Sequence, residues 1–312
     1  MRTAVVLFNL GGPDSKEAIK PFLMNFFMDP NIVRLPPPFR YLLAKYISIK
    51  RSKKEAGTSY GELGDKSPLL ENSGAQAEAL ENLLGNEYKS FVCMRYWHPM
   101  ADNVAMRVKN YNPDNIVLLP LYPQYSTTTT RSSYQAWKKA CAAIGLSKPE
   151  KLICCYPHEN GFIRANAANV REAFDKCELE TGMSPRVLFS AHGLPESIVK
   201  DGDPYQSQCE KCAAEIVHAI GIENLDWQIC YQSRVGAQKW LGPSTEEALK
   251  KAAKDGVPVV ILPHAFTQEH VETLVEIEIE YREVAEHIGV PAFYRVPTVS
   301  THPDFIRGLA DM

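Results

Sequence analysis

The chain has 312 residues, of which 45% are hydrophobic and 23% are charged, as in ordinary folded globular proteins. This composition excludes a disordered chain, a fibrous repeat and a coiled coil. The 34 lysine and arginine residues are balanced by 37 aspartate and glutamate residues, which gives a net charge of −3. Such a balance argues against a protein that holds nucleic acid through phosphate contacts.

The N-terminal sequence lacks the pattern of a secretory signal peptide, because its apolar run at residues 4–8 is short and is interrupted by Asn9. No run approaches the roughly 20 apolar residues of a membrane-spanning helix. We therefore expect a cytoplasmic protein whose eight cysteines remain thiols.

Short apolar runs alternate along the chain with longer segments of helical periodicity. In the first half we predict strands at residues 4–8, 90–94, 116–121 and 151–156, and helices at residues 15–28, 39–50, 72–84, 101–110 and 132–144. In the second half we predict strands at residues 186–190, 226–231, 257–262 and 292–296, and helices at residues 161–181, 205–220, 244–254 and 269–287. This order is typical of parallel sheets covered by helices on both faces.

The length predicts about two domains of roughly 150 residues each. We place the first α/β domain at residues 1–158 and the second at residues 159–301. A short helix at residues 302–312 is expected to pack back on the first domain.

Ligands of open parallel sheets bind at the carboxyl ends of the strands. The segments that follow the predicted strands are rich in histidine, arginine, tyrosine and glycine; they include residues 9–13, 95–99, 122–126, 191–195, 232–236 and 264–267. The pair Gly11-Gly12 indicates a tight strand-to-helix turn and not a nucleotide site, because neither a G-x-G-x-x-G pattern nor a P-loop pattern is present.

Glu272, Glu276 and Glu280 recur at every fourth position, so an α-helix would present them in a row, with Glu269 one turn earlier. Like charges at this spacing destabilise a helix by roughly 0.2–0.5 kcal/mol per pair. The row is either a solvated acidic face or a series of oxygen ligands along which a divalent cation could move.

His192 follows an apolar strand and precedes Gly193. It is either a structural histidine or a functional one. An imidazole accepts a proton near neutral pH and is a good ligand for borderline metals such as ferrous iron.

The cysteines give little support for a metal centre. Cys209 and Cys212 form a single C-x-x-C pair, whereas zinc and iron–sulfur sites usually need two such pairs. Cys154 and Cys155 fall in a predicted strand, where neighbouring side chains point to opposite faces. We interpret all of them as structural thiols.

Five groups of motifs, taken in order, resemble the ferrochelatase family. They are NLGGP at 9–13, LYPQYS at 121–126, LFSAHGLP at 188–195 with GDPY at 202–205, YQSRVG at 231–236 with WLGP at 240–243, and the segment 265–281, which contains EHVETL and ends in IEY. The resemblance extends from about residue 4 to the C-terminus. Each motif alone is weak, but their common order is specific.

The resemblance implies two similar Rossmann-like domains of the chelatase type with a porphyrin cleft between them. It implies an enzyme that inserts Fe²⁺ into protoporphyrin IX, giving protohaem with release of two protons. His192 and Glu272 would be the catalytic pair and would also contact the metal. Further metal contacts are implied for Glu269, Glu276 and Glu280.

The resemblance also implies a set of residues that contact or border the macrocycle: Leu10, Tyr60, Arg95, Tyr125, Ser126, Trp240 and His270. Arg95 could bind a propionate group or could orient a buried polar network.

We expect no tightly bound cofactor, since Fe²⁺ is a substrate. Some family members hold a [2Fe–2S] cluster with a cysteine in the middle motif and a cysteine-bearing C-terminal tail. Here Thr127, directly after LYPQYS, stands at the position of that cysteine, and no cysteine follows Cys230, so we expect no cluster.

Residues 36–47 are largely apolar and include Arg40 and Lys45. We interpret them as a lip over the cleft, or as a segment that contacts a membrane surface. The protein would then be cytoplasmic, or peripheral on the inner face of the membrane. Its expected partners are porphyrin and Fe²⁺, with no nucleic acid, and its oligomeric state is left open.

Two alternatives remain. The same residues would serve a coproporphyrin III ferrochelatase. A non-catalytic haem or metal carrier could use the same scaffold, but a carrier has no need of an acidic supply path, so the carboxylates at 269–280 favour the enzyme.

Overall fold

The computed structural model describes residues 1–55, 60–234 and 238–312. Val235 and Gly236 of the fourth motif group lie outside the described residues. The chain divides into two compact units, Met1–Cys155 and Tyr156–Met312. The domain boundary that we predicted, after residue 158, lies slightly further along the chain than the division after Cys155. The porphyrin cleft expected between the domains stays a prediction.

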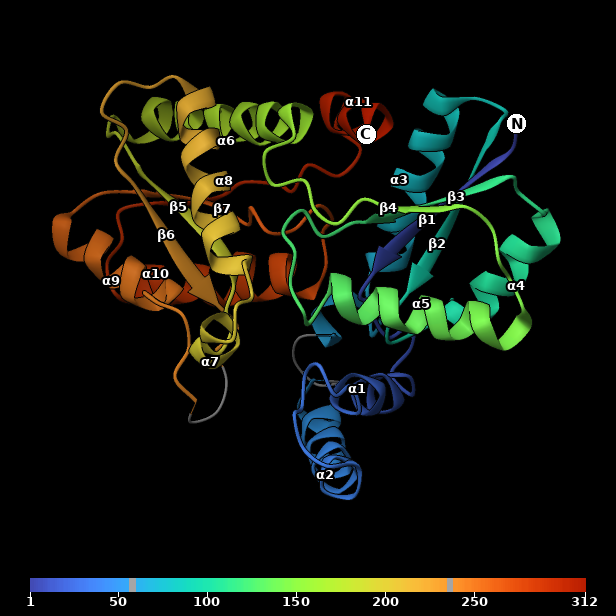
Figure 1. The fold of residues 1–312 in the computed structure, drawn as a ribbon. Helices are drawn as coiled ribbons and strands as arrows, with labels where there is room; N and C mark the ends of the chain where they lie inside the picture. Colours follow the sequence, from blue (N-terminus) through green and yellow to red (C-terminus); the bar gives the residue numbers. More distant parts are fainter. Residues whose placement is uncertain (56–59, 235–237) are drawn as a thin grey trace. The chain divides into compact units, whose positions relative to one another are not determined.

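The first unit contains a parallel sheet with the strand order β2-β1-β3-β4 (Figure 1). Its strands are β1 (Thr3–Asn9), β2 (Tyr88–Met94), β3 (Asn115–Pro120) and β4 (Glu150–Leu152). Every residue of β1 is buried, as expected for a central strand whose sheet is covered on both faces.

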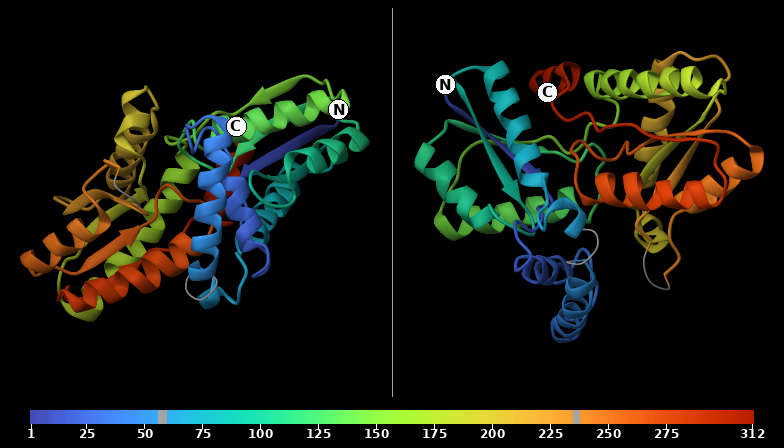
Figure 2. Two further views of the ribbon diagram at one scale, coloured as in Figure 1. Left: turned by 90° about the horizontal axis from the view of Figure 1, so that it is seen from below. Right: turned by 180° about the vertical axis from the view of Figure 1, so that it is seen from behind.

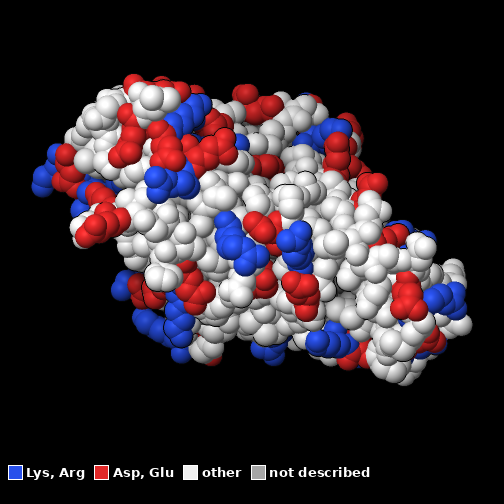
Figure 3. All heavy atoms as spheres, turned by 90° about the horizontal axis from the view of Figure 1, so that it is seen from above, with Lys and Arg blue, Asp and Glu red and all other residues white. Residues whose placement is uncertain are grey.

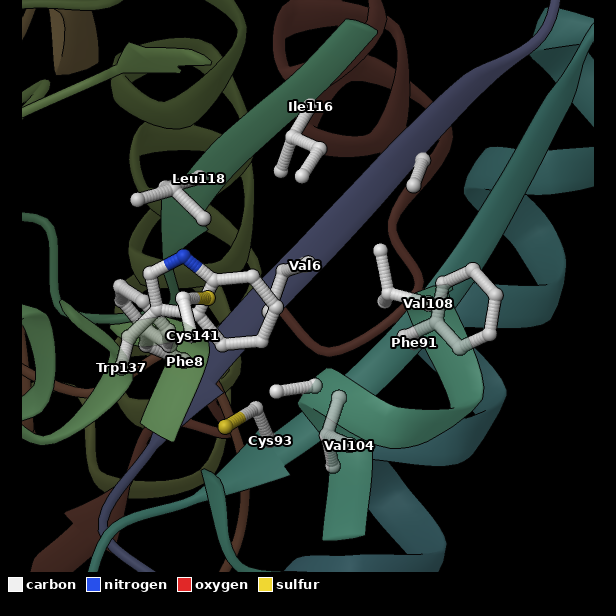
Figure 4. Packing of buried hydrophobic residues seen from close by; sticks show 12 residues of the cluster. Val6, Phe8, Phe91, Cys93, Val104, Val108, Ile116, Leu118, Trp137 and Cys141 are labelled. Atoms are coloured by element: carbon white, nitrogen blue, oxygen red, sulfur yellow. The ribbon is translucent and has the colours of Figure 1, made fainter. Parts of the chain in front are cut away.

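The helices of the first unit are α1 (Ile19–Phe27), α2 (Pro37–Glu55), the 3₁₀ helix η1 (Gly61–Leu63), α3 (Leu69–Leu84), α4 (Ala101–Tyr111) and α5 (Thr130–Ile144). Helices α4 and α5 cover one face of the sheet, where Val104 and Trp137 pack with Val6 and Phe8 of β1 (Figure 4). Helix α3 packs on β1 and β2 and lies on the other side of the sheet (Figure 1). Helices α1 and α2 pack against each other.

The second unit repeats this arrangement with the strand order β6-β5-β7-β8. Its strands are β5 (Arg186–His192), β6 (Trp227–Gln232), β7 (Val259–Leu262) and β8 (Phe293–Arg295). Its helices are α6 (Asn160–Thr181), α7 (Glu196–Lys200), α8 (Tyr205–Ile220), α9 (Thr245–Asp255), the π-helix η2 (Glu272–Tyr281), α10 (Arg282–His287) and α11 (Pro303–Asp311).

Helices α6 and α8 lie on one side of the second sheet, and η2 with α10 lies on the other (Figure 2). On the latter side, Ile277 of η2 and Ala285 of α10 join a buried cluster with Leu188 and Ile261 of the strands. The two sheets have the same strand order when strands are counted from the start of each unit. The prediction of two similar parallel α/β domains is confirmed.

Two local predictions differ from the structure. The predicted helix at 269–287 is not a continuous α-helix, because residues 272–281 form a π-helix. The predicted strand at 151–156 ends early, at Leu152. The C-terminal helix α11 packs on α6 within the second unit, and its expected packing on the first domain stays a prediction. This packing is aromatic, since the ring of Phe305 lies 5.8 Å from that of Phe162.

Acidic and basic side chains are interspersed over the face shown in Figure 3, in keeping with the small net charge. Among the helices that the structure describes, none combines the length and the apolar character that a bilayer-spanning segment requires.

Candidate active site

The second unit places His192 where parallel sheets commonly bind ligands. The neighbours of β5 are β6 on one side and β7 on the other, so the chain connections diverge at β5. Ligands bind at the carboxyl ends of strands at such a switch point. His192 is the last residue of β5, opposite Gln232 at the end of β6, and its side chain is 38% exposed. The carboxyl end of β5 therefore presents an accessible imidazole.

His192 is hydrogen-bonded to Glu272, the first residue of η2. The distance between His192 Nδ1 and Glu272 Oε2 is 2.8 Å. An ionised carboxylate can only accept a hydrogen bond, so Nδ1 carries the hydrogen and Nε2 keeps its lone pair. The pair thus has a fixed tautomer, with one ring nitrogen left as a base or ligand.

Glu276 is held by donors from the end of β6 and from its own helix. It accepts hydrogen bonds from Ser233 N at 2.8 Å, Ser233 Oγ at 2.5 Å, Gln232 Nε2 at 3.2 Å and Tyr281 Oη at 3.1 Å. Burial, followed by the nearby charge of Glu272, raises the pKa of Glu276 above its ordinary value. The hydrogen bonds therefore fix the position of this carboxylate, while burial makes its ionised form energetically costly. A cation bound beside it would offset that cost and would therefore be strongly favoured.

The outer carboxylates of the predicted row have different surroundings. Glu269 accepts from Arg295 Nη1 at 2.9 Å and from Thr298 N at 2.9 Å. Although burial acts to raise the pKa of Glu269, the charge of Arg295 and these hydrogen bonds lower it overall. Glu280 is exposed at the other end of η2. The metal roles expected for both residues stay predictions.

The predicted row is carried by a π-helix and not by an α-helix. A π-helix closes its hydrogen bonds between residues i and i+5, so residues four apart still lie near one side of it. Glu272 and Glu276 face the same strand end, because the first contacts His192 and the second contacts Gln232 and Ser233. π-helical segments often occur at functional sites.

Trp240 lies beside the segment that follows His192. Leu241 N donates to Leu194 O at 2.9 Å, and Pro195 forms an antiparallel bridge with Trp240. The glycine at 193 permits this approach, because a Cβ there would lie 2.8 Å from Gln232 O and 3.4 Å from an indole carbon of Trp240. The loop geometry thus brings the expected Trp240 next to the segment that follows the histidine.

His270 is buried just before η2 and packs against Phe266, with ring centroids 4.6 Å apart. Burial lowers the pKa of His270, with Glu272 and Glu269 opposing that effect. A neutral imidazole therefore borders the pair formed by His192 and Glu272.

In the first unit, Arg95 is part of a buried polar network. Its Nη2 lies 2.9 Å from Asp29 Oδ2, and its Nε donates to Ser132 Oγ at 2.6 Å. Tyr96 Oη also donates to Asp29, at 2.8 Å. Of the two interpretations of Arg95, this network supports the orienting role; contact with a propionate stays a prediction.

The other predicted substrate residues of the first unit lie near strand ends and in loops. Leu10 directly follows β1, and its carbonyl accepts from Tyr96 N at 2.9 Å. Tyr60 is buried and Tyr125 is half-buried. Ser126 organises the turn before α5, with its Oγ 2.8 Å from Thr128 Oγ1.

Sequence reasoning assigned no role to the side chains that position the carboxylates, above all Ser233, Tyr281 and Arg295, or to Asp29, which pairs with Arg95. Ser233 directly follows a predicted strand, which was an available signal. Within the described part of the chain, no three His, Cys, Asp or Glu side chains are arranged to hold a metal ion together.

Comparison with known proteins decides the family. The sequence profile described as "Ferrochelatase" matches residues 2–312. The chain belongs to the ferrochelatase family. A ferrochelatase from Wolbachia sp. subsp. Drosophila simulans (strain wRi) is 52% identical over 316 residues, covering 100% of this chain and 98% of the relative. The Caulobacter vibrioides (strain NA1000 / CB15N) ferrochelatase is 48% identical, covering 99% of this chain and 88% of the relative. The family expected from the motifs is confirmed.

Solved structures of other chelatases share the fold of this ferrochelatase family member. SirB from Bacillus subtilis with Fe³⁺ aligns with a TM-score of 0.56 at 12% identity, covering 100% of this chain and 94% of that chain. CbiX, the terminal enzyme for biosynthesis of siroheme in denitrifying bacteria, aligns with a TM-score of 0.51 at 12% identity, covering 100% and 97%. These likenesses support the chelatase-type fold.

Proposed function

We propose that this chain is a ferrochelatase that inserts Fe²⁺ into protoporphyrin IX, giving protohaem and releasing two protons. The observation that carries the proposal is the hydrogen-bonded pair of His192 and Glu272 at the carboxyl end of β5, in a chain of the ferrochelatase family. The pair offers both of the things that metal insertion needs, a proton acceptor and a metal ligand.

The first requirement is a base. A free-base porphyrin carries two N–H groups whose protons must leave as the metal enters. Nε2 of His192 is the ring nitrogen that carries the basic lone pair, because Nδ1 donates to Glu272. When Nε2 takes a proton, the imidazolium forms beside the carboxylate of Glu272, which stabilises the new positive charge.

The second requirement is a supply of Fe²⁺ that does not trap the ion. Glu272 and Glu276 place two carboxylates near the end of β6. Because burial makes the ionised form of Glu276 costly, a cation beside it would be favoured. Two carboxylates and one imidazole bind Fe²⁺ less firmly than the four nitrogens of a porphyrin do. Iron that reaches them would therefore pass on to the macrocycle.

An anaerobic assay tests the proposal. The full chain is mixed with Fe²⁺ and either protoporphyrin IX or coproporphyrin III, and the loss of porphyrin fluorescence is followed. Faster turnover of protoporphyrin IX is expected. Faster turnover of coproporphyrin III would favour the alternative substrate, and turnover of neither would refute the enzymatic function.

We propose that residues 36–47, which include the first part of helix α2, make a peripheral contact with a membrane. Phe39, Leu42 and Tyr46 are each 63% exposed, and Arg40 and Lys45 lie among them. Such apolar and basic side chains suit the interface of an anionic bilayer. Co-sedimentation with phosphatidylglycerol vesicles, lost in Phe39→Ser/Leu42→Ser, would support the contact; equal sedimentation of the variant would contradict it.

We also propose that turnover needs no resident cofactor. The cysteines at 93, 141, 177, 209, 212 and 230 are buried thiols. Full iron insertion by protein that elemental analysis shows to be free of metal would support this proposal. A requirement for bound iron and sulfide would contradict it.

A further inference from the structure

Cys154 and Cys155 bring two thiols together outside the predicted active site. Their Sγ atoms lie 2.6 Å apart. Neighbouring side chains of a strand would point to opposite faces. Strand β4 ends at Leu152, so both cysteines lie beyond it and their side chains converge.

The chain is anchored on both sides of this pair. Ile153 N donates to Leu118 O at 2.9 Å, which holds the chain to the end of the sheet. Tyr156 is buried, with its ring 6.1 Å from that of Phe162 in an edge-on arrangement. The two thiols are therefore placed together by the backbone before any reaction.

Accessibility distinguishes this pair from the other cysteines. Cys154 is exposed and Cys155 is half-buried, whereas the remaining six are buried. Burial raises the pKa of Cys141 and that of Cys230 to about 11, so those groups stay protonated thiols. An oxidant in solution would therefore reach the sulfur atoms at 154 and 155 more readily than those at the six buried positions.

We propose that Cys154 and Cys155 form a reversible dithiol–disulfide site that is oxidised by low-molecular-weight disulfides such as glutathione disulfide. The thiolate of Cys154 attacks one sulfur of the reagent and releases the first glutathione thiolate. The thiolate of Cys155 then attacks the sulfur of Cys154, forms the Sγ–Sγ bond and releases the second. Two electrons pass from the cysteines to the reagent, and the two thiol protons end on the two glutathione molecules.

The resulting bond is expected to be easily reduced. Cα atoms of adjacent residues are about 3.8 Å apart, which is less than the roughly 4.4–6.8 Å of ordinary disulfides. Such strain raises the reduction potential, as in labile and regulatory disulfides. The pair occupies the end of the first unit, so its oxidation would stiffen the chain segment between β4 and α6.

Intact-mass measurement tests the proposal on the reduced full chain treated with glutathione disulfide. The wild type should lose two hydrogens without gaining a glutathione adduct, and dithiothreitol should restore its mass. Peptide mapping should assign the bond to residues 154 and 155. Cys154→Ser should instead retain one glutathione adduct at Cys155, and Cys177→Ser, a change at a buried cysteine, should behave as the wild type.

Phenylarsine oxide, which needs two neighbouring thiols, provides a second measurement. One equivalent should bind to the wild type and to Cys177→Ser, whereas Cys154→Ser and Cys155→Ser should not bind it. Stable glutathione adducts on the wild type at these positions, or thiols there that never react, would overturn the proposal.

Discussion

Nδ1 of His192 lies 2.8 Å from Oε2 of Glu272, although the two residues are 80 positions apart in the sequence. The first ends a parallel strand and the second begins a π-helix. Because the carboxylate fixes the proton on Nδ1, the other ring nitrogen is the one that would act on a substrate in the proposed reaction. His192→Ala should therefore abolish iron insertion while porphyrin binding survives.

The expected loss in turnover is about 100-fold or more, as for removal of a general base. Anaerobic fluorescence measures turnover, and porphyrin absorbance titration measures binding. His287→Ala removes an exposed imidazole from the end of α10 and serves as the control. Near-normal turnover in His192→Ala would refute the role given to this residue.

Glu276→Gln should mainly weaken the apparent affinity for iron. The substitution removes a buried negative charge that a cation would neutralise, while it keeps the size of the side chain. The KM for Fe²⁺ should rise several-fold with a smaller change in the KM for porphyrin. Glu283→Gln, at an exposed position of α10, is the matched control. An unchanged iron dependence would count against the supply path.

Gly193→Ala should impair both stability and turnover. The added Cβ would lie 2.8 Å from the backbone oxygen of Gln232, so the ends of β5 and β6 must separate. That movement displaces His192 from Glu272. Gly74→Ala in α3 meets nothing within 4 Å and should be neutral or stabilising by roughly 0.5–1 kcal/mol. Thermal unfolding and the fluorescence assay distinguish the two variants.

Arg95→Leu should destabilise the protein strongly. It would leave the fully buried carboxylate of Asp29 without its cationic partner, which typically costs about 3–5 kcal/mol. Arg171→Leu breaks an ion pair with Asp175 in which both side chains are half exposed, so its cost should stay below about 1 kcal/mol. Equal urea midpoints for the two variants would contradict the structural role of Arg95.

Acid should weaken the contribution of Glu269. The pKa of this carboxyl is lower in the folded protein than its ordinary value of 4.5, so its stabilising effect is complete above that value. The effect is lost as the pH falls through the folded-state pKa. The difference in unfolding free energy between the wild type and Glu269→Gln should therefore shrink from neutral to acidic pH. Urea unfolding at several pH values measures this difference, and Glu71→Gln, at an exposed position, is the control. A difference in unfolding free energy that does not change with pH would contradict the prediction.

The sequence alone determined the fold class and the position of the predicted catalytic histidine. A run such as residues 4–8, apolar on both faces, has to be a central strand, and the helical periods between such runs require parallel connections. His192 could be placed at a strand end for the same reason. The ordered motifs then gave the family, because each contributes residues that follow a strand or begin a helix.

Only the tertiary structure decided how the polar side chains meet. Apart from Tyr281 of the same helix, the donors that hold Glu276 come from Gln232 and Ser233, 44 and 43 positions away, and the π-helix that carries it has no distinct local pattern. The convergence of Cys154 and Cys155 likewise depends on where β4 leaves its partner strand. The periodicity of apolar residues indicates which side chains are buried. Hydrogen-bond partners are set by the packing of distant segments, which local sequence does not encode.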